Sequence, residues 1–237
     1  MVSFKPAQVR FLAALGAAAL TGFALFVYDL WVHHELVDDY LVINLILAGI
    51  PLLISTRLAA VLKHKLWSAW EPLVLSLLWL LFLPNSFYMI SDYIHLQNAT
   101  GGNVLFDAVM FSAFIYLAVG MGFISVYQVH SELKRRLQPI TSAVLIGLVL
   151  LGSGFAVYLG RDLRWNSWDI FIHPGGLLFD VSSLLIKPQS YPGMIKISVS
   201  FFLVLASLYA FSWNAVRIVW QHGARDLAQR IKSTRTP

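Results

Sequence analysis

The sequence predicts an all-α integral membrane protein, a single bundle of about six transmembrane helices. Of its 237 residues, 58% are hydrophobic and only 12% are charged, which is about half the charged fraction of a typical soluble domain. Several apolar runs are long enough to cross roughly 30 Å of hydrocarbon, a distance that takes about 20 helical residues. Lys and Arg lie in short clusters between these runs, a pattern that favours a membrane surface over nucleic acid as the partner.

The first predicted span covers residues 9–32. Lys5 and Arg10 precede or open it, as they would in a signal peptide, but its apolar run is longer than the 7–15 residues of a signal core. The other five spans follow at residues 40–62, 70–90, 104–129, 140–159 and 195–219. No composition shift or internal repeat divides the chain, so we expect one transmembrane domain over residues 1–237. The absence of cysteine excludes disulfides and a Cys nucleophile.

The positive charges predict the orientation of the bundle. Thirteen of the 17 Lys and Arg residues lie at the N-terminus, in the second and fourth connections, or at the C-terminal end. The other side of the membrane holds the remaining four, which are Arg161, Arg164, Lys187 and Lys196. Because clustered Lys and Arg mark the cytoplasmic side, we expect both termini in the cytoplasm and a location in the cell membrane.

One connection is long, from residue 160 to 196 between the fifth and sixth spans, on the predicted extracytoplasmic side. Its breakers are the run from His173 to Gly176 and two later prolines, Pro188 and Pro192. Between them, residues 177–186 form an apolar run that is too short to span the bilayer. This run either lies at the membrane interface or re-enters the bundle, and the sequence leaves both alternatives open.

Polar residues gather at the predicted extracytoplasmic ends of the spans. Asp29 ends the first span, Asn44 begins the second, and Asp107 begins the fourth. An ionisable group in hydrocarbon costs several kcal/mol and usually serves a function. The polar layer is therefore the predicted functional region.

The first motif of this layer runs from Leu83 to Leu96. After Pro84, which kinks the helix or restarts it, Asn85, Tyr88, Asp92 and His95 stand at i, i+3, i+7 and i+10. At 100° per residue these four positions fall within an arc of about 80°. We therefore expect them to share one helix face.

The second motif runs from Tyr158 to Asp169. If the helix continues through it, two stripes form, one of Arg161, Arg164, Trp165 and Trp168, and a second of Tyr158, Asp162, Trp165 and Asp169. These charges must pair with each other, line a wet cavity or hold an anion. The two arginines can grip phosphate or carboxylate in a bidentate manner.

These motifs carry a resemblance. The pattern Pro84-Asn85-x-x-Tyr88-x-x-x-Asp92-x-x-His95-Leu96, followed by Tyr158-x-Gly160-Arg161-x-x-Arg164-Trp165-Asn166-Ser167-Trp168-Asp169, resembles a family of bacterial multi-pass membrane proteins of unknown function. The resemblance extends roughly from the second helix to the sixth. It implies a bacterial cytoplasmic-membrane protein and brings no reaction or substrate with it.

The residues themselves favour a polar site that binds or processes an anionic or lipid-linked molecule, with membrane lipids as partners. In this hypothesis His95, oriented by Asp92, transfers a proton. The predicted ligand-binding residues are Asn85, Tyr88, Asp107, Arg161, Arg164, Trp165, Asn166, Trp168 and Asp169. A divalent metal on Asp92 and His95 is a weaker hypothesis, because no specific ligand spacing supports it. Two alternatives stay open: an assembly protein whose polar motifs are structural locks, and a small-solute transporter.

Overall fold

The computed structural model describes residues 16–17, 19–28, 31, 39–98 and 104–233. Helices account for most of these residues, and none of them forms a strand. The elements in chain order are α2 (Asp39–Val61), α3 (Trp70–Tyr88), the 3₁₀ helix η1 (Met89–Asn98), α4 (Val104–Lys134), α5 (Pro139–Asp162), α6 (Asp169–Ile172), α7 (Pro174–Ile186), η2 (Pro188–Ser190) and α8 (Pro192–Ser233).

Within the described residues, five helical segments are long and apolar enough to cross a membrane. They are Tyr40–Val61, Trp70–Leu96, Val104–Lys134, Pro139–Asp162 and Pro192–Val216, and they correspond to the second to sixth predicted spans. Of the first predicted span, residues 9–32, the structure describes 16–17, 19–28 and 31, which include a short apolar helix, Ala19–Tyr28; the rest of the span lies outside the described residues. Helices α4, α5 and α8 continue past the ends predicted for the fourth, fifth and sixth spans.

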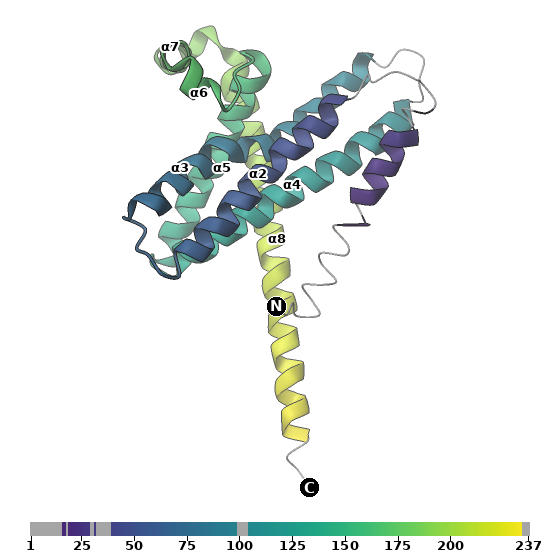
Figure 1. Cartoon of the computed structure of the whole chain (residues 1–237), viewed down its shortest axis with the longest axis vertical. Coiled ribbons are helices and arrows are strands. Elements are labelled where there is room, and N and C mark those ends of the chain that lie inside the picture. The colour runs from purple at the N-terminus through teal and green to yellow at the C-terminus, as the bar shows by residue number, and fades with distance from the viewer. Residues whose placement is uncertain (1–15, 18, 29–30, 32–38, 99–103, 234–237) are drawn as a thin grey trace.

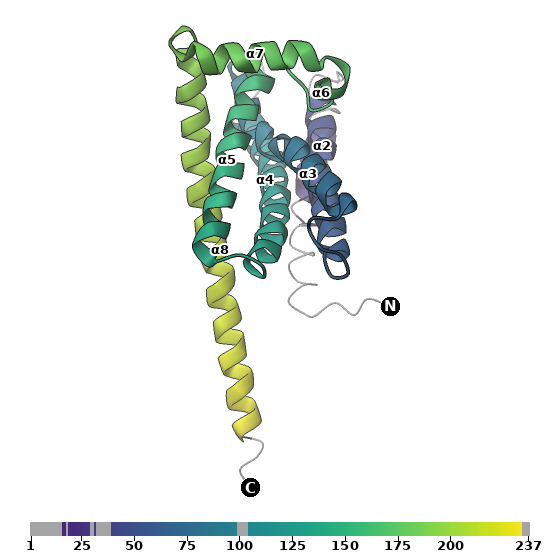
Figure 2. The same cartoon turned by 90° about the vertical axis from the view of Figure 1, so that its left-hand side faces the viewer.

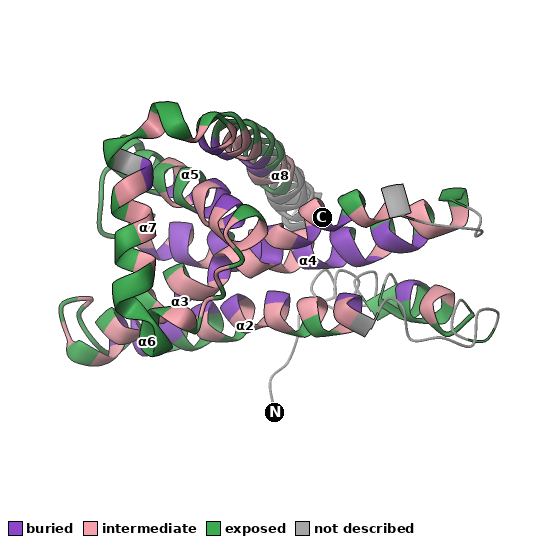
Figure 3. Ribbon diagram, turned by 90° about the horizontal axis from the view of Figure 1, so that it is seen from above, coloured by how far each residue is buried: buried purple, intermediate pink, exposed green. Residues whose placement is uncertain are grey.

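Helix α4 lies at the centre of the bundle. Half of its 18-residue apolar window is buried, against 22–33% in the other four spans. On one side α2 packs against α3 and α4, and on the other α5 packs against α8, while α3 and α5 join the two halves (Figure 1). The view from above shows the same arrangement, with buried positions concentrated along α4 (Figure 3).

Two glycines permit the closest helix contacts. A Cβ atom at Gly122 of α4 would lie 2.7 Å from Cβ of Ser86 on α3, and a Cβ at Gly154 of α5 would lie 2.6 Å from the carbonyl oxygen of Ser198 on α8. Lipid tails are as apolar as leucine, so helices in a membrane associate through close packing at small residues. Gly122 and Gly154 therefore set the α3–α4 and α5–α8 distances.

Side-chain hydrogen bonds between the spans supplement this packing. Nε1 of Trp79 on α3 donates to Oγ of Ser125 on α4 at 2.5 Å, and that hydroxyl donates to the carbonyl of Pro51 on α2 at 3.2 Å. Ser86 likewise donates to the carbonyl of Ala48 at 2.8 Å. These bonds tie α2, α3 and α4 into one unit.

The two ends of the bundle differ. At one end, here called the α7 end, α7 lies across the bundle, roughly perpendicular to α5 and α8 (Figure 2). The predicted long connection, residues 160–196, is therefore largely helical, and its apolar run crosses the end of the bundle instead of passing between the spans. At the opposite end α8 continues beyond the other helices to Ser233 (Figure 2).

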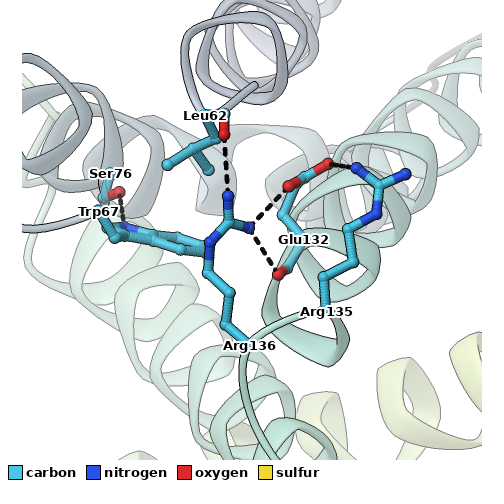
Figure 4. A network of polar contacts seen from close by, with 6 residues as sticks. All are labelled: Leu62, Trp67, Ser76, Glu132, Arg135 and Arg136. Atoms are coloured by element: carbon cyan, nitrogen blue, oxygen red, sulfur yellow. Dashed lines mark hydrogen bonds and ion pairs between the residues drawn. The ribbon is translucent and has the colours of Figure 1, made fainter. Parts of the chain in front are cut away.

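The end opposite α7, here called the basic end, is held by an ion-pair network (Figure 4). Glu132 of α4, whose side chain is 8% exposed, pairs with Nη1 of Arg135 at 2.6 Å and Nη1 of Arg136 at 2.7 Å. Arg136 also donates to the carbonyl of Leu62 at 2.9 Å and lies over the ring of Trp67. The α2–α3 connection is thereby fixed to the end of α4.

Candidate functional site

A cluster of polar side chains joins three helices at the α7 end. It consists of Asn44 on α2, Asp92 and His95 on η1, and Arg161 on α5, here called the Asp92–Arg161 cluster. Oδ1 of Asp92 lies 3.7 Å from Nη1 of Arg161, and Oδ2 accepts a hydrogen bond of 3.2 Å from Nδ2 of Asn44. The Asp92 side chain is 1% exposed and that of Arg161 is 22% exposed. The carboxylate is therefore enclosed, whereas the guanidinium reaches the surface.

His95 holds the other side of the guanidinium. Its Nε2 lies 3.4 Å from Nη1 and 3.3 Å from Nη2 of Arg161. Because an arginine can only donate, Nε2 must carry the lone pair, which places the imidazole proton on Nδ1. The ring also packs against Tyr40 of α2, with centroids 4.9 Å apart. In this arrangement His95 acts as an acceptor that orients Arg161.

The local helix type explains why Asp92 and His95 point the same way. The spacing of these residues predicted an α-helix through both, but the helix changes to a 3₁₀ helix at Met89. In a 3₁₀ helix the side chains at i and i+3 eclipse each other. Asp92 and His95 therefore share a face although the assumed periodicity was wrong, and Asn85 and Tyr88 share the preceding face on α3.

The Pro84 turn brings α3 to the segment that follows α5. Helix α3 continues through Pro84, which has no N–H and crowds the preceding turn. Two carbonyls of this turn accept side-chain hydrogen bonds, that of Leu81 from Ser167 at 3.1 Å and that of Phe82 from Asn85 at 3.0 Å. Nδ2 of Asn85 also donates to Oγ of Ser167 at 3.0 Å. The two sequence motifs thus contact each other directly.

A glycine permits a second contact between the motifs. A Cβ atom at Gly160 would lie 3.1 Å from Cε2 of Tyr88 and 3.3 Å from the carbonyl oxygen of Trp165. The ring of Tyr88 therefore lies against the backbone of α5 one residue before Arg161. This close approach positions Arg161 next to η1.

The two stripes predicted for the second motif do not form, because α5 ends at Asp162. The chain turns at Arg164, which has a φ of 59° and is the one non-glycine residue with positive φ in the described chain. The N–H of Trp165 then donates to the carbonyl of Leu159 at 3.2 Å. This left-handed turn separates Arg164, Trp165 and Trp168 from the face of α5 that carries Arg161.

Arg164 occupies a conformation that normally favours glycine. For an L-residue, left-handed backbone costs roughly 1–2 kcal/mol. Its side chain is exposed and makes no hydrogen bond or ion pair with the described residues. Arg164 therefore lies next to the end of α5, as Arg161 does, and has no ion-pair partner among the described residues.

The remaining predicted ligand residues lie in the segment after α5, except for Asp107, which lies on α4. Trp165 turns toward α7, where its Nε1 donates to Oδ2 of Asp180 at 2.9 Å and its ring lies against Gly176. Asn166 donates from its backbone N–H to Oδ2 of Asp169 at 2.6 Å, and Trp168 is exposed. Asp107 lies half-buried in the first turn of α4, and the contacts of the Asp92–Arg161 cluster given above do not include it.

The metal hypothesis receives no support from the geometry. No group of three or more His, Asp or Glu residues in the described part of the chain is placed to hold a metal ion. Nη1 of Arg161 lies 3.7 Å from Oδ1 of Asp92 and 3.4 Å from Nε2 of His95, so both residues already face a cation of the protein itself. The catalytic and ligand roles of the residues named above stay predictions.

Sequence reasoning missed Asp180 and Ser167 as parts of this region. Asp180 lies inside the mostly apolar run 177–186, and a single carboxylate in such a run is itself a signal for a specific partner. Ser167 was inside the second motif, but its contact with Asn85 spans 82 residues of sequence. Neither pairing has a local signature.

These features define a class: a multi-pass helical membrane protein with a polar cluster at one end of its bundle. The chain belongs to the family described as "Protein of unknown function (DUF1361)", which matches residues 43–208. The match runs from α2 into α8 and includes both polar motifs. No curated protein and no solved structure matches the chain.

Proposed function

We propose that the α7 end faces the outside of the cell and binds the anionic headgroup of a lipid or lipid-linked molecule through Arg161 and Arg164. The orientation follows from the clustered Lys and Arg at the basic end. The observation that carries the proposal is the pair of arginines at the end of α5, one partly neutralised and one unpaired within the described chain. A guanidinium can bind phosphate through two parallel hydrogen bonds.

The geometry leaves Arg161 able to bind a further anion. A guanidinium has five N–H donors, and charge-assisted hydrogen bonds are normally about 2.7–2.9 Å long. The contacts of Arg161 with His95 and Asp92 range from 3.3 to 3.7 Å. Asp92 and His95 therefore orient the side chain without saturating it. Within this proposal they are positioning residues, and the surface of Arg161 contacts the ligand.

A second candidate function follows from the burial of Asp92. An enclosed carboxylate that joins α2, η1 and α5 is also what a structural lock requires, and replacing one partner of such a pair usually destabilises a protein strongly. In that case the polar motifs stabilise the bundle, and Arg164 does not bind a ligand. The two candidates differ in what they predict for Arg164, which makes no contact that a lock would need.

The test compares lipid binding by purified variants. Native mass spectrometry would count phosphatidic acid and phosphatidylcholine molecules retained by the wild type, Arg161→Gln and Arg164→Gln. The matched control is Arg57→Gln, which removes the same charge from an arginine that is 65% exposed and paired with Glu71 at the basic end. Thermal unfolding in detergent would show which variants keep the wild-type fold.

We expect the wild type and Arg57→Gln to prefer phosphatidic acid, and both Arg161→Gln and Arg164→Gln to lose this preference. An unchanged preference in Arg164→Gln, together with unfolding of Arg161→Gln, would favour the structural lock. Loss of the preference in Arg57→Gln alone would place the anionic lipid at the basic end and contradict the proposal.

A further inference from the structure

Helix α7 has two faces of different chemistry. On the face that points to the bundle, here called its inner face, Leu184 is 1% exposed and packs with Tyr158 of α5 and Met194 of α8. Asp180 lies one turn before Leu184 on the same side and accepts a hydrogen bond of 2.9 Å from Nε1 of Trp165. An apolar contact and a polar contact therefore attach the inner face of α7 to the bundle.

The opposite face of α7 is apolar and exposed. Leu178, Phe179 and Ile186 are 68%, 71% and 74% exposed. Together with Ser182 they lie within an arc of about 100° at 100° per residue, and these four residues are here called the outer face of α7. The hydroxyl of Ser182 donates to the carbonyl of Phe179 at 2.8 Å. The outer face thus carries no charge and no free side-chain donor.

The contacts of the inner face determine the level at which α7 lies. Tyr158 belongs to the segment Pro139–Asp162 and Met194 to the segment Pro192–Val216, both of which can cross a membrane. Leu184 packs on both residues, so α7 lies level with the outermost turns of these two spans. It is roughly perpendicular to them (Figure 2), and seen from above it lies at the edge of the bundle (Figure 3).

Exposed apolar surface continues from α7 into the elements on either side of it. Phe171 and Ile172 of α6 are 66% and 61% exposed, and Ile195 in the first turn of α8 is 54% exposed. Ile195 belongs to a span, whose exposed apolar side chains contact lipid. Lys187 is exposed directly after α7, and its long side chain can reach the headgroups from the end of an apolar helix.

We propose that α6 and α7 form an interfacial membrane-binding element, with the outer face of α7 in the acyl chains directly beneath the lipid headgroups. Interfacial amphipathic helices bury their apolar face roughly 5–10 Å into this layer. Lipid is the occupant that fits, because α7 lies at the edge of the bundle and level with two span ends, where the bilayer surrounds the protein. The inference does not depend on the proposed headgroup binding, since it uses neither Arg161 nor Arg164.

The test uses the absence of cysteine from the chain. A nitroxide spin label would be attached to Phe179→Cys and to Ile186→Cys in the full-length protein, reconstituted in vesicles of phosphatidylcholine alone. Leu203→Cys, at a 60% exposed position midway along the span of α8, is the hydrocarbon reference. Ser68→Cys, at an exposed position of the α2–α3 connection, is the water reference. All four positions are exposed, so the labels replace no buried side chain.

Collision rates of the labels with oxygen, which concentrates in hydrocarbon, and with a water-soluble nickel chelate would report their depth. We expect the oxygen-to-nickel ratio at Phe179→Cys and Ile186→Cys to be several-fold higher than at Ser68→Cys and lower than at Leu203→Cys. A ratio between the two references is what a position directly beneath the headgroups predicts.

Three other results would overturn the proposal. A ratio as low as that of Ser68→Cys would show that the outer face of α7 contacts water. Low collision rates with both reagents, together with dipolar broadening between labels, would show that a second copy of the chain covers the face. A ratio as high as that of Leu203→Cys would place the face in the middle of the bilayer. None of these results bears on the binding of a headgroup by Arg161 and Arg164, so the two proposals can fail separately.

Discussion

The Asp92–Arg161 cluster predicts an unequal response to removing its two charges. Arg161→Gln leaves a carboxylate that is 1% exposed with Asn44 as its neutral partner, whereas Asp92→Asn leaves a guanidinium that is 22% exposed and can turn toward water. An uncompensated buried charge is the more costly of the two. Arg161→Gln should therefore destabilise the protein more than Asp92→Asn.

The magnitudes follow from burial and distance. Breaking a well-buried pair costs about 3–5 kcal/mol, and the 3.7 Å separation of Oδ1 and Nη1 places this pair at the weak end. We expect a loss of about 2–3 kcal/mol in unfolding free energy for Arg161→Gln, and about 1 kcal/mol for Asp92→Asn, which keeps an oxygen acceptor. The double variant should lose about 1–2 kcal/mol less than the sum of the two, because contacting residues are not additive.

The assay is reversible unfolding of the purified protein in mixed detergent micelles, followed for the wild type, both single variants and the double variant. Arg164→Gln is the control, since its side chain makes no hydrogen bond or ion pair with the described residues that the change could break. Equal losses for the two single variants, or additivity of the pair, would refute the reasoning from burial.

Four further substitutions have expected outcomes of their own. Gly122→Leu places a side chain against α3 and should lower the unfolding free energy by about 1–3 kcal/mol through overpacking. Gly147→Ala adds a methyl group in open space and should stabilise α5 by about 0.5–1 kcal/mol. A lower melting temperature for Gly147→Ala would contradict this expectation. Glu132→Gln removes the carboxylate that pairs with Arg136, so amide hydrogen exchange in residues 62–69 should become faster. Exchange as slow as in the wild type would show that the ion-pair network does not hold the α2–α3 connection. Arg164→Gly should stabilise the protein by about 1 kcal/mol, because glycine adopts a positive φ without strain. The same variant should lose the preference for phosphatidic acid. A glycine variant that is less stable than the wild type would show that the arginine side chain holds the turn.

The sequence predicted the second to sixth spans well because a bilayer imposes a length that hydropathy reveals directly. It also located the right helix ends, since Asp92, His95 and Arg161 are ionisable residues next to apolar runs. It failed where local conformation depends on tertiary contacts. Nothing between Leu163 and Asn166 marks a left-handed residue, because the turn is closed by Arg164, where a glycine would have been the usual signal.

The change of helix type at Met89 was equally hidden. Residues 89–95 carry no proline or glycine that would mark the change, and η1 packs against α4 and α2, which are distant in the sequence. Helix α8 shows that the end of an apolar span does not predict the end of a helix. The predicted span marked where apolar residues end, but a helix stops only where its backbone bonds stop, and α8 continues to Ser233.

The pairing of Asp92 with Arg161 also bears on how the chain is assembled during synthesis. Asn44 is made 48 residues before Asp92, so the neutral partner is already present when the carboxylate leaves the ribosome. Arg161 follows His95 by 66 residues, which at about 5–20 residues per second is a delay of about 3–13 s. During that interval α2, α3 and α4 must keep the carboxylate near water. The late arrival of the α5–α8 hairpin then supplies the cation, and insertion of that hairpin becomes the step that completes the bundle.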